Sequence, residues 1–127
     1  MKLTNGAIYD IREAVQKFSD AKGRTAFVLF RALRKLQEEI QDCENQKNEL
    51  IKKYGKENED GSISISQDDK EASQKFFAEF GPILNFEIDV ELPLMSEDDF
   101  AALYDVDAPN ATMNDYAIID AFLVDHK

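Results

Sequence analysis

The fold is decided by residues 24–54, which read RTAFVLFRALRKLQEEIQDCENQKNELIKKY. Apolar side chains recur there at helical steps and form one stripe along a helix. The stripe consists of Ala26, Leu29, Leu33, Leu36, Ile40, Cys43, Leu50 and Tyr54. At 1.5 Å per residue such a helix is roughly 45 Å long, more than the width of a small domain. We therefore expect the Cys43–Leu50 end to project from the domain or to meet a partner.

Two interpretations of this stripe stay open. Core packing is favoured, because the polar residue Lys47 falls on the stripe and would weaken a seam between two helices. A coiled-coil dimer is the alternative.

The segment before the long helix also has helical spacing. Thr4 can cap its start, we expect it to end near Ser19, and Ala21-Lys22-Gly23 separates it from the long helix. Its apolar positions are Ile8, Ile11, Val15 and Phe18.

A short strand and a third helix are predicted after the long one. Asp60-Gly61 is a turn signal, and Ser62–Ser66 alternates as a strand does. Asp68 can cap the third helix, and Gly81-Pro82 is expected to end it. Its expected buried face consists of Ala72, Phe76, Phe77 and Phe80.

Residues 84–92 show the clearest period-two pattern of the chain, with apolar and mostly acidic residues in turn. Pairing of this strand with Ile63–Ile65 would give a small antiparallel sheet. The expected fold class is therefore α+β, mainly helical, with one long central helix and a small antiparallel β-hairpin or sheet.

Two further helix starts are predicted near the end of the chain. Ser96 precedes three acidic residues, which favours a helix start, and Phe100, Leu103 and Tyr104 are expected to face inward. Thr112 and Asp115 have the spacing of a capping box. The apolar positions of the last predicted helix are Tyr116, Ile119, Phe122 and Leu123.

The charge is divided by position within what we expect to be one domain, residues 1–127. Residues 1–56 hold 12 Lys and Arg against 8 Asp and Glu, whereas 57–127 hold 3 against 18, which gives the net charge of −11. We therefore expect a helical part, residues 1–55, with more basic than acidic residues, and an acidic part, residues 56–127, that contains the hairpin strands and further helices. Surface carboxylates repel nucleic acid and attract basic protein surfaces, so we expect a protein partner, no direct nucleic-acid binding and no membrane span.

Cellular location is indicated by two features. The N-terminal residues have no apolar signal stretch, and Cys43 is the single cysteine, so no internal disulfide can form. Both favour a reducing cytoplasm.

Several stretches carry a resemblance. They are Met1–Gly6, Leu50–Gly55 at the end of the Leu-striped helix, Asp60-Gly61, Glu87–Val90, Leu94 and Ser96–Phe100. Over roughly residues 1–100 the chain resembles a family of small proteins of unknown function encoded by phages and prophages of Gram-positive bacteria. The resemblance implies a phage product working in the cytoplasm of an infected bacterium, as a structural accessory or against a host defence.

Metal chemistry has weak support. Residues 56–67 imitate a calcium-binding EF-hand loop, but Lys56 and Gln67 stand where acidic ligands are required. Cys43 and His126 are too few for a structural zinc site. We expect no required cofactor, with adventitious binding of zinc or calcium to Asp125-His126 or to Glu97–Asp99 as the alternative.

Catalysis and nucleic-acid binding are also disfavoured. Cys43 lies mid-stripe and His126 is next to the last residue, so they form no evident nucleophile and base pair, and we expect no enzyme. A basic cluster exists in the long helix, at Arg24, Arg31, Arg34 and Lys35, but the net charge opposes contact with a polyanion, and a solvated face is the favoured interpretation.

Two functions remain. In the first, the protein is an anti-CRISPR-like inhibitor whose carboxylates dock on the basic groove of a host defence nuclease, such as a CRISPR effector. The expected partner-binding residues are Glu87, Asp89, Glu91, Glu97, Asp98, Asp99, Asp105 and Asp107. In the alternative it is a virion or tail-assembly accessory that forms an oligomer. We expect the free protein to be a monomer or a small homo-oligomer.

Overall fold

The computed structural model describes residues 1–126 and is mainly helical. In chain order its elements are β1 (Lys2–Thr4), α1 (Asn5–Gln16), α2 (Gly23–Tyr54), β2 (Lys56–Glu57), β3 (Ile63–Ser64), α3 (Lys70–Leu84), β4 (Glu87–Asp89), α4 (Glu97–Ala101), the 3-10 helix η1 (Ala102–Asp105) and α5 (Met113–Leu123). The predicted α+β class with one long helix is confirmed. No helix within residues 1–126 has the length and apolar character needed to cross a membrane.

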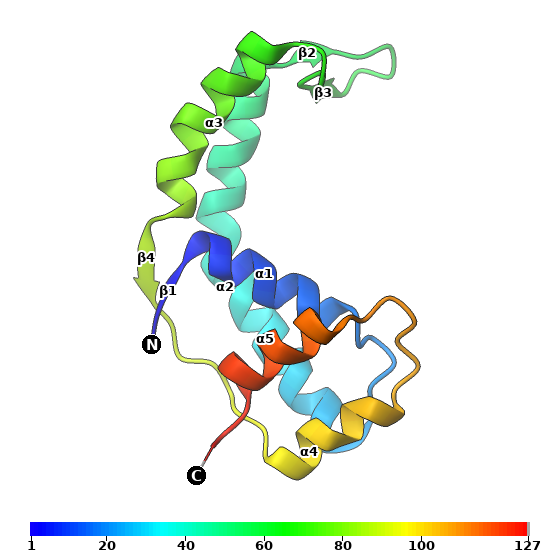
Figure 1. Cartoon of the computed structure of the whole chain (residues 1–127). Coiled ribbons are helices and arrows are strands. Elements are labelled where there is room, and N and C mark those ends of the chain that lie inside the picture. The colour runs from blue at the N-terminus through cyan, green and yellow to red at the C-terminus, as the bar shows by residue number, and fades with distance from the viewer. Residues whose placement is uncertain (127) are drawn as a thin grey trace.

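Helix α2 runs through the whole molecule and joins two parts (Figure 1). Its first half lies in a body, where α1 packs on α2, α5 packs on α1, and α4 contacts α2. Its second half pairs with α3 in an arm that carries β2 and β3 at its tip. The Cys43–Leu50 end therefore extends beyond the body, and α3 covers one side of it.

The core follows the predicted stripes. Thr4 caps α1 by accepting a hydrogen bond of 3.0 Å from the backbone N–H of Ala7, and the helix ends at Gln16, close to the predicted end. Gly23 begins α2 with a φ of +67°, a left-handed value that favours glycine. The largest side chains that are fully buried lie mostly in the body and are Phe18, Ile8, Ile11, Leu36, Ile40, Met95, Leu103, Ile119, Leu123 and Val90.

The predicted pairing of the two strands is wrong. β3 pairs with β2 at the tip of the arm, and β4 pairs with β1, with Ile88 opposite Leu3. The reason is α3, which carries the chain from the tip back toward the body (Figure 1). Its 15 residues span roughly 22 Å, so the strand that follows it cannot reach β3.

Both predicted ends of α3 need correction. Asp69, not Asp68, is the N-cap, and it accepts a hydrogen bond of 3.1 Å from the backbone N–H of Ala72. Gly81-Pro82 does not end the helix, which continues to Leu84. Proline has a helical φ, but it lacks the N–H donor and its ring crowds the carbonyl four residues earlier, so a proline in a last turn persists where other contacts hold that turn.

Asn5 supplies such a contact. Its side-chain amide donates a hydrogen bond of 2.8 Å to the carbonyl oxygen of Ile83. Its backbone N–H donates a second one, of 3.1 Å, to the carbonyl oxygen of Phe86. Asn5 is 7% exposed, so α1 closes the end of α3 with a buried hydrogen bond.

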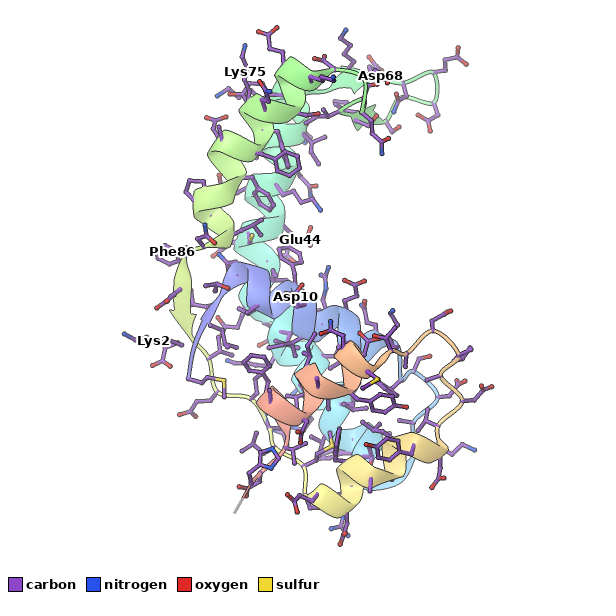
Figure 2. The ribbon with its side chains drawn as sticks, in the orientation of Figure 1. Lys2, Asp10, Glu44, Asp68, Lys75 and Phe86 are labelled. Carbon is purple, nitrogen blue, oxygen red and sulfur yellow. The ribbon has the colours of Figure 1, made fainter. Side chains whose placement is uncertain are left out.

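Three aromatic residues expected in the interior are exposed. Phe77 is 63% exposed because α3 packs through Phe76 and Phe80, one turn apart. Phe86 is 64% exposed because regular pairing in this segment is limited to Glu87–Asp89 (Figure 2). Tyr104 is 65% exposed and stacks its ring on that of Tyr116, whereas Leu103 is fully buried as predicted.

The helix starts near the end of the chain are confirmed. Ser96 caps α4 by accepting a hydrogen bond of 3.1 Å from Asp99. Thr112 and Asp115 form the capping box of α5. Local sequence is sufficient at these starts because both partners of a cap lie within four residues.

Candidate functional site

The eight carboxylates predicted to bind a partner lie along one stretch of chain but at two places on the molecule. Three are in or next to β4, and five are in α4, η1 and the residue pair that follows (Figure 1). Residues 92–96 separate the two groups. They therefore do not form the single acidic surface that the sequence suggested.

Cations lie close to the β4 group. Asp89 accepts a hydrogen bond of 3.0 Å from the amino group of Met1. Glu91 lines a pocket of about 310 Å³ together with Arg31, Arg34 and Lys35. Glu87 is exposed and makes no ion pair within residues 1–126.

The α4 group is held by specific contacts. The Asp99 carboxylate lies 3.9 Å from Arg24 and is largely turned inward, while Glu97 lies 3.4 Å from the ring of His126. The carboxylate of Asp98 is exposed and makes no ion pair within residues 1–126. Of the three acidic residues in the first turn, Asp98 is thus the one free to meet a partner.

Asp105 and Asp107 lie at a recess of about 580 Å³. The turn between α1 and α2 contributes Asp20 and Lys22 to the same recess. All three carboxylates are exposed and make no ion pair among residues 1–126. We call Asp20, Asp105 and Asp107 the acidic recess. Three carboxylates against one lysine give it a negative potential that suits a Lys or Arg side chain.

The recess is positioned by buried contacts. Leu103, in η1 between the acidic residues, is fully buried and anchors η1 on the body. Thr25, in the first turn of α2 and 4% exposed, donates a hydrogen bond of 2.7 Å to the backbone carbonyl oxygen of Asp99. The start of α2 is therefore tied to α4, the helix that leads directly into η1.

Asp20 was missed by sequence reasoning, as were Phe27 and Phe30. Both phenylalanines stand on the solvent face of α2, each with an arginine four residues later. The sequence does contain a signal for Phe27 and Phe30. Both phenylalanines fall outside the apolar stripe, and each precedes an arginine by four residues, which is helical spacing.

His126 connects the end of the described chain to α4. Its Nε2 lies 2.9 Å from the carbonyl oxygen of Asp120, and its Nδ1 lies 3.4 Å from Glu97. The hydrogen bond to the Asp120 carbonyl, followed by that to Glu97, raises the pKa of His126 above its usual value of 6.5. The protonated ring can donate to both partners at once.

The predicted metal candidates are arranged for other contacts. Residues 56–64 form the β2–β3 hairpin, in which Asp60 accepts hydrogen bonds from the backbone N–H and the hydroxyl of Ser62. These hydrogen bonds lower the pKa of Asp60. Within residues 1–126, no group of three or more His, Cys, Asp and Glu side chains is arranged to hold a metal ion.

Cys43 and His126 lie apart in the fold. Cys43 is 3% exposed on α2, near the crossing with α1, whereas His126 contacts α4 and α5. The Tyr9 hydroxyl is enclosed at this crossing and has no hydrogen-bond partner among the described residues. Burial raises the pKa of Tyr9, and the neighbouring Cys43 and Glu44 add to that rise. The phenol beside the cysteine is therefore held in its neutral form.

Comparison of the chain with protein-family models, with curated proteins and with solved structures gives no match. The resemblance to phage proteins therefore stays a prediction.

Proposed function

We propose that this chain is a non-enzymatic binding protein that docks through its acidic recess on a basic surface of another protein. The observation that carries this proposal is the joining of Asp20 to Asp105 and Asp107, three unpaired carboxylates from distant parts of the sequence. Asp98 on α4 adds a further free carboxylate to the body. A protein that only needed solubility would have no need to gather these charges around a recess.

The partner class we propose is a nuclease of a host defence system, such as a CRISPR effector. Such proteins hold nucleic acid in grooves rich in Lys and Arg, and a rigid set of carboxylates competes for those groups through the same electrostatic attraction. The chain would then act as an inhibitor in the cytoplasm of an infected bacterium. Support for this comes from the charge and from the resemblance of residues 1–100 to phage proteins.

Affinity capture tests the proposal. The tagged chain is exposed to lysate of a Gram-positive host with an active CRISPR system, and bound proteins are eluted by a salt gradient. We expect a nuclease released at moderate salt, because exposed charge pairs are screened. A captured nuclease whose DNA cleavage is unaffected by the chain would count against inhibition.

Three triple variants locate the contact. Neutralising the recess with Asp20→Asn, Asp105→Asn and Asp107→Asn is expected to abolish capture. The matched control neutralises three exposed carboxylates at the tip of the arm with Glu57→Gln, Glu59→Gln and Asp68→Asn and should leave capture intact (Figure 2). If capture depends instead on Glu87, Asp89 and Glu91, the recess is not the contact.

A second candidate function is supported by the arm. Its exposed Phe77 and Ile63 border an apolar pocket of about 330 Å³ that Ile51, Ile65 and Phe76 also line. An apolar surface on a projecting helical pair suits assembly of several copies, as a tail-assembly accessory would need. Light scattering after size exclusion tests this: an oligomer that Phe77→Glu converts to a monomer would favour assembly, and a wild-type monomer would exclude it.

A further inference from the structure

The first half of α2 presents an aromatic and basic surface to solvent. Phe27 and Phe30 are 60% and 61% exposed. The guanidinium of Arg31 lies 5.7 Å from the ring centre of Phe27, and that of Arg34 lies 6.0 Å from the ring centre of Phe30. We call these four residues the Phe–Arg face.

This face is the side of α2 opposite the core. Leu29, Ala32 and Leu36 are 4% exposed or less and mark the buried side of the same helix turns. Two phenylalanines on the solvent side contribute nothing to that core. Large exposed apolar side chains that gather in this way are typical of a binding surface.

The two arginines of the face have no carboxylate partner. Arg31 and Arg34 make no ion pair within residues 1–126, whereas Arg12 lies 3.5 Å from Glu44. A guanidinium that stacks on a ring is held in place, and its N–H groups remain available for two hydrogen bonds to one carboxylate. The face is therefore prepared for carboxylates from outside the molecule.

An apolar groove borders the face. It has a volume of about 280 Å³ and lies between the end of α1 and the start of α2. Phe30 forms one wall, and the other apolar residues that line it are Val15, Phe18, Ala21, Ala26, Leu29 and Leu33. A groove of this size and lining fits one large apolar side chain.

A cationic pocket borders the face on its other side. Arg31, Arg34 and Lys35 line it, together with Glu38, Glu91, Leu92 and Pro93. Lys35 already pairs with Glu39 at 3.1 Å, and within residues 1–126 Arg31 and Arg34 make no ion pair with Glu38 or Glu91, the two carboxylates that line the pocket. The apolar groove, the Phe–Arg face and this pocket thus form a continuous band across α2, because Phe30 lines the groove and Arg34 lines the pocket.

We propose that this band binds an acidic segment of a partner protein, with one large apolar side chain in the groove and carboxylates on Arg31 and Arg34. Charge complementarity identifies the occupant as acidic, and the apolar groove identifies it as a peptide with a hydrophobic anchor. A nucleic acid suits the band less well, because it offers no aliphatic side chain for the apolar groove. The band and the acidic recess lie on different residues, so this proposal stands or falls independently of the proposed function.

Peptide selection tests the proposal with the full chain as bait. Random peptides of about 16 residues, long enough for an anchor with flanking charges, are displayed on yeast and sorted for binding. We expect the enriched peptides to combine Asp or Glu with Leu, Phe or Trp. Absence of such acidic peptides from the enriched set overturns the proposal, whereas basic peptides would report on the acidic recess and not on the band.

Variants then place the binding on the band. Arg31→Glu with Arg34→Glu, and separately Phe30→Ala, should each weaken the best synthetic peptide by about tenfold or more. The matched controls are Lys52→Glu with Lys56→Glu, which changes the net charge equally, and Phe77→Ala, which removes an exposed phenylalanine from α3. Equal weakening by the controls, or no weakening by the band variants, contradicts the assignment.

Two other possible occupants of the band, a nucleic acid and a second copy of the chain, predict different results for the same variants. A fluorescein-labelled single-stranded oligonucleotide that binds more tightly than the best peptide, and loses binding in the Arg31→Glu and Arg34→Glu variant, would assign the band to nucleic acid. A wild-type dimer in sedimentation that this variant dissociates would assign it to a second copy of the chain. Either outcome overturns the acidic-peptide proposal.

Discussion

The hydroxyl of Thr25 donates a hydrogen bond of 2.7 Å to the backbone carbonyl oxygen of Asp99, 74 residues later. The bond joins the start of α2 to α4, the helix that carries the acidic first turn. The bond is partly buried, and Thr25 itself is 4% exposed. One side chain thus ties the basic and the acidic halves of the sequence together.

Replacing this hydroxyl with a methyl group is expected to destabilise the body. Thr25→Val keeps the shape but leaves the Asp99 carbonyl without its donor, which should lower the free energy of unfolding by about 1–2 kcal/mol. Urea denaturation measures the change. Thr25→Ser retains the donor and is the control; if both variants are equally stable, the hydrogen bond is not important.

The end of α3 is expected to depend on Asn5. Asn5→Ala removes the buried donor to the Ile83 carbonyl and should lower the free energy of unfolding by about 1–3 kcal/mol. Hydrogen exchange should speed up most at Asn85 and Phe86, whose N–H groups bond within this turn. The control is Asn48→Ala on the exposed face of α2, where alanine is the better helix former and stability should not fall.

His126 should titrate above 6.5, because its protonated ring is hydrogen-bonded to the Asp120 carbonyl and to Glu97. The stabilisation from a raised pKa is complete below the unfolded value near 6.5 and is lost as the pH rises through the folded pKa. NMR follows the ring directly, since this is the single histidine of the chain. Glu97→Gln should move the midpoint down, and an unchanged midpoint would show that Glu97 has no part in it.

Replacing either of two adjacent phenylalanines on α3 with alanine should change stability by very different amounts. Phe76 is 8% exposed and stacks near Phe80 with ring centres 5.3 Å apart, so Phe76→Ala should cost about 3–5 kcal/mol of stability. Phe77 is 63% exposed, so Phe77→Ala should change stability by less than about 0.5 kcal/mol. Thermal unfolding of the two variants compares them, and a reversed order would mean that α3 is rotated on α2.

The candidate site was only partly accessible to sequence reasoning. Asp105 and Asp107 were expected to contact a partner, and the structure places them at a recess. Asp20 joins them because the α1–α2 turn folds next to η1, which is a contact between residues more than 80 positions apart. Asp99 has a cation nearby for the same reason: Arg24 lies far from it in sequence but 3.9 Å away in space.

Features that depend on neighbours within about one helical turn could be predicted from the amino-acid sequence. The stripe of α2, the caps at Thr4, Ser96 and Thr112 and the turn at Asp60-Gly61 belong here. Each of them is set by side-chain spacing or by a hydrogen bond over a few residues, so the local pattern contains both partners.

The pairing of the strands, the end of α3 and the exposure of the aromatic residues depend on the packing of the whole chain. β4 meets β1 because α3 returns the chain to the body, and α3 runs past Pro82 because Asn5 closes its last turn. Phe27 and Phe30 are free to form a binding face because no other element covers that side of α2 in the described chain. These outcomes depend on contacts between residues that are distant in sequence. A local sequence pattern does not indicate the free energies of such contacts.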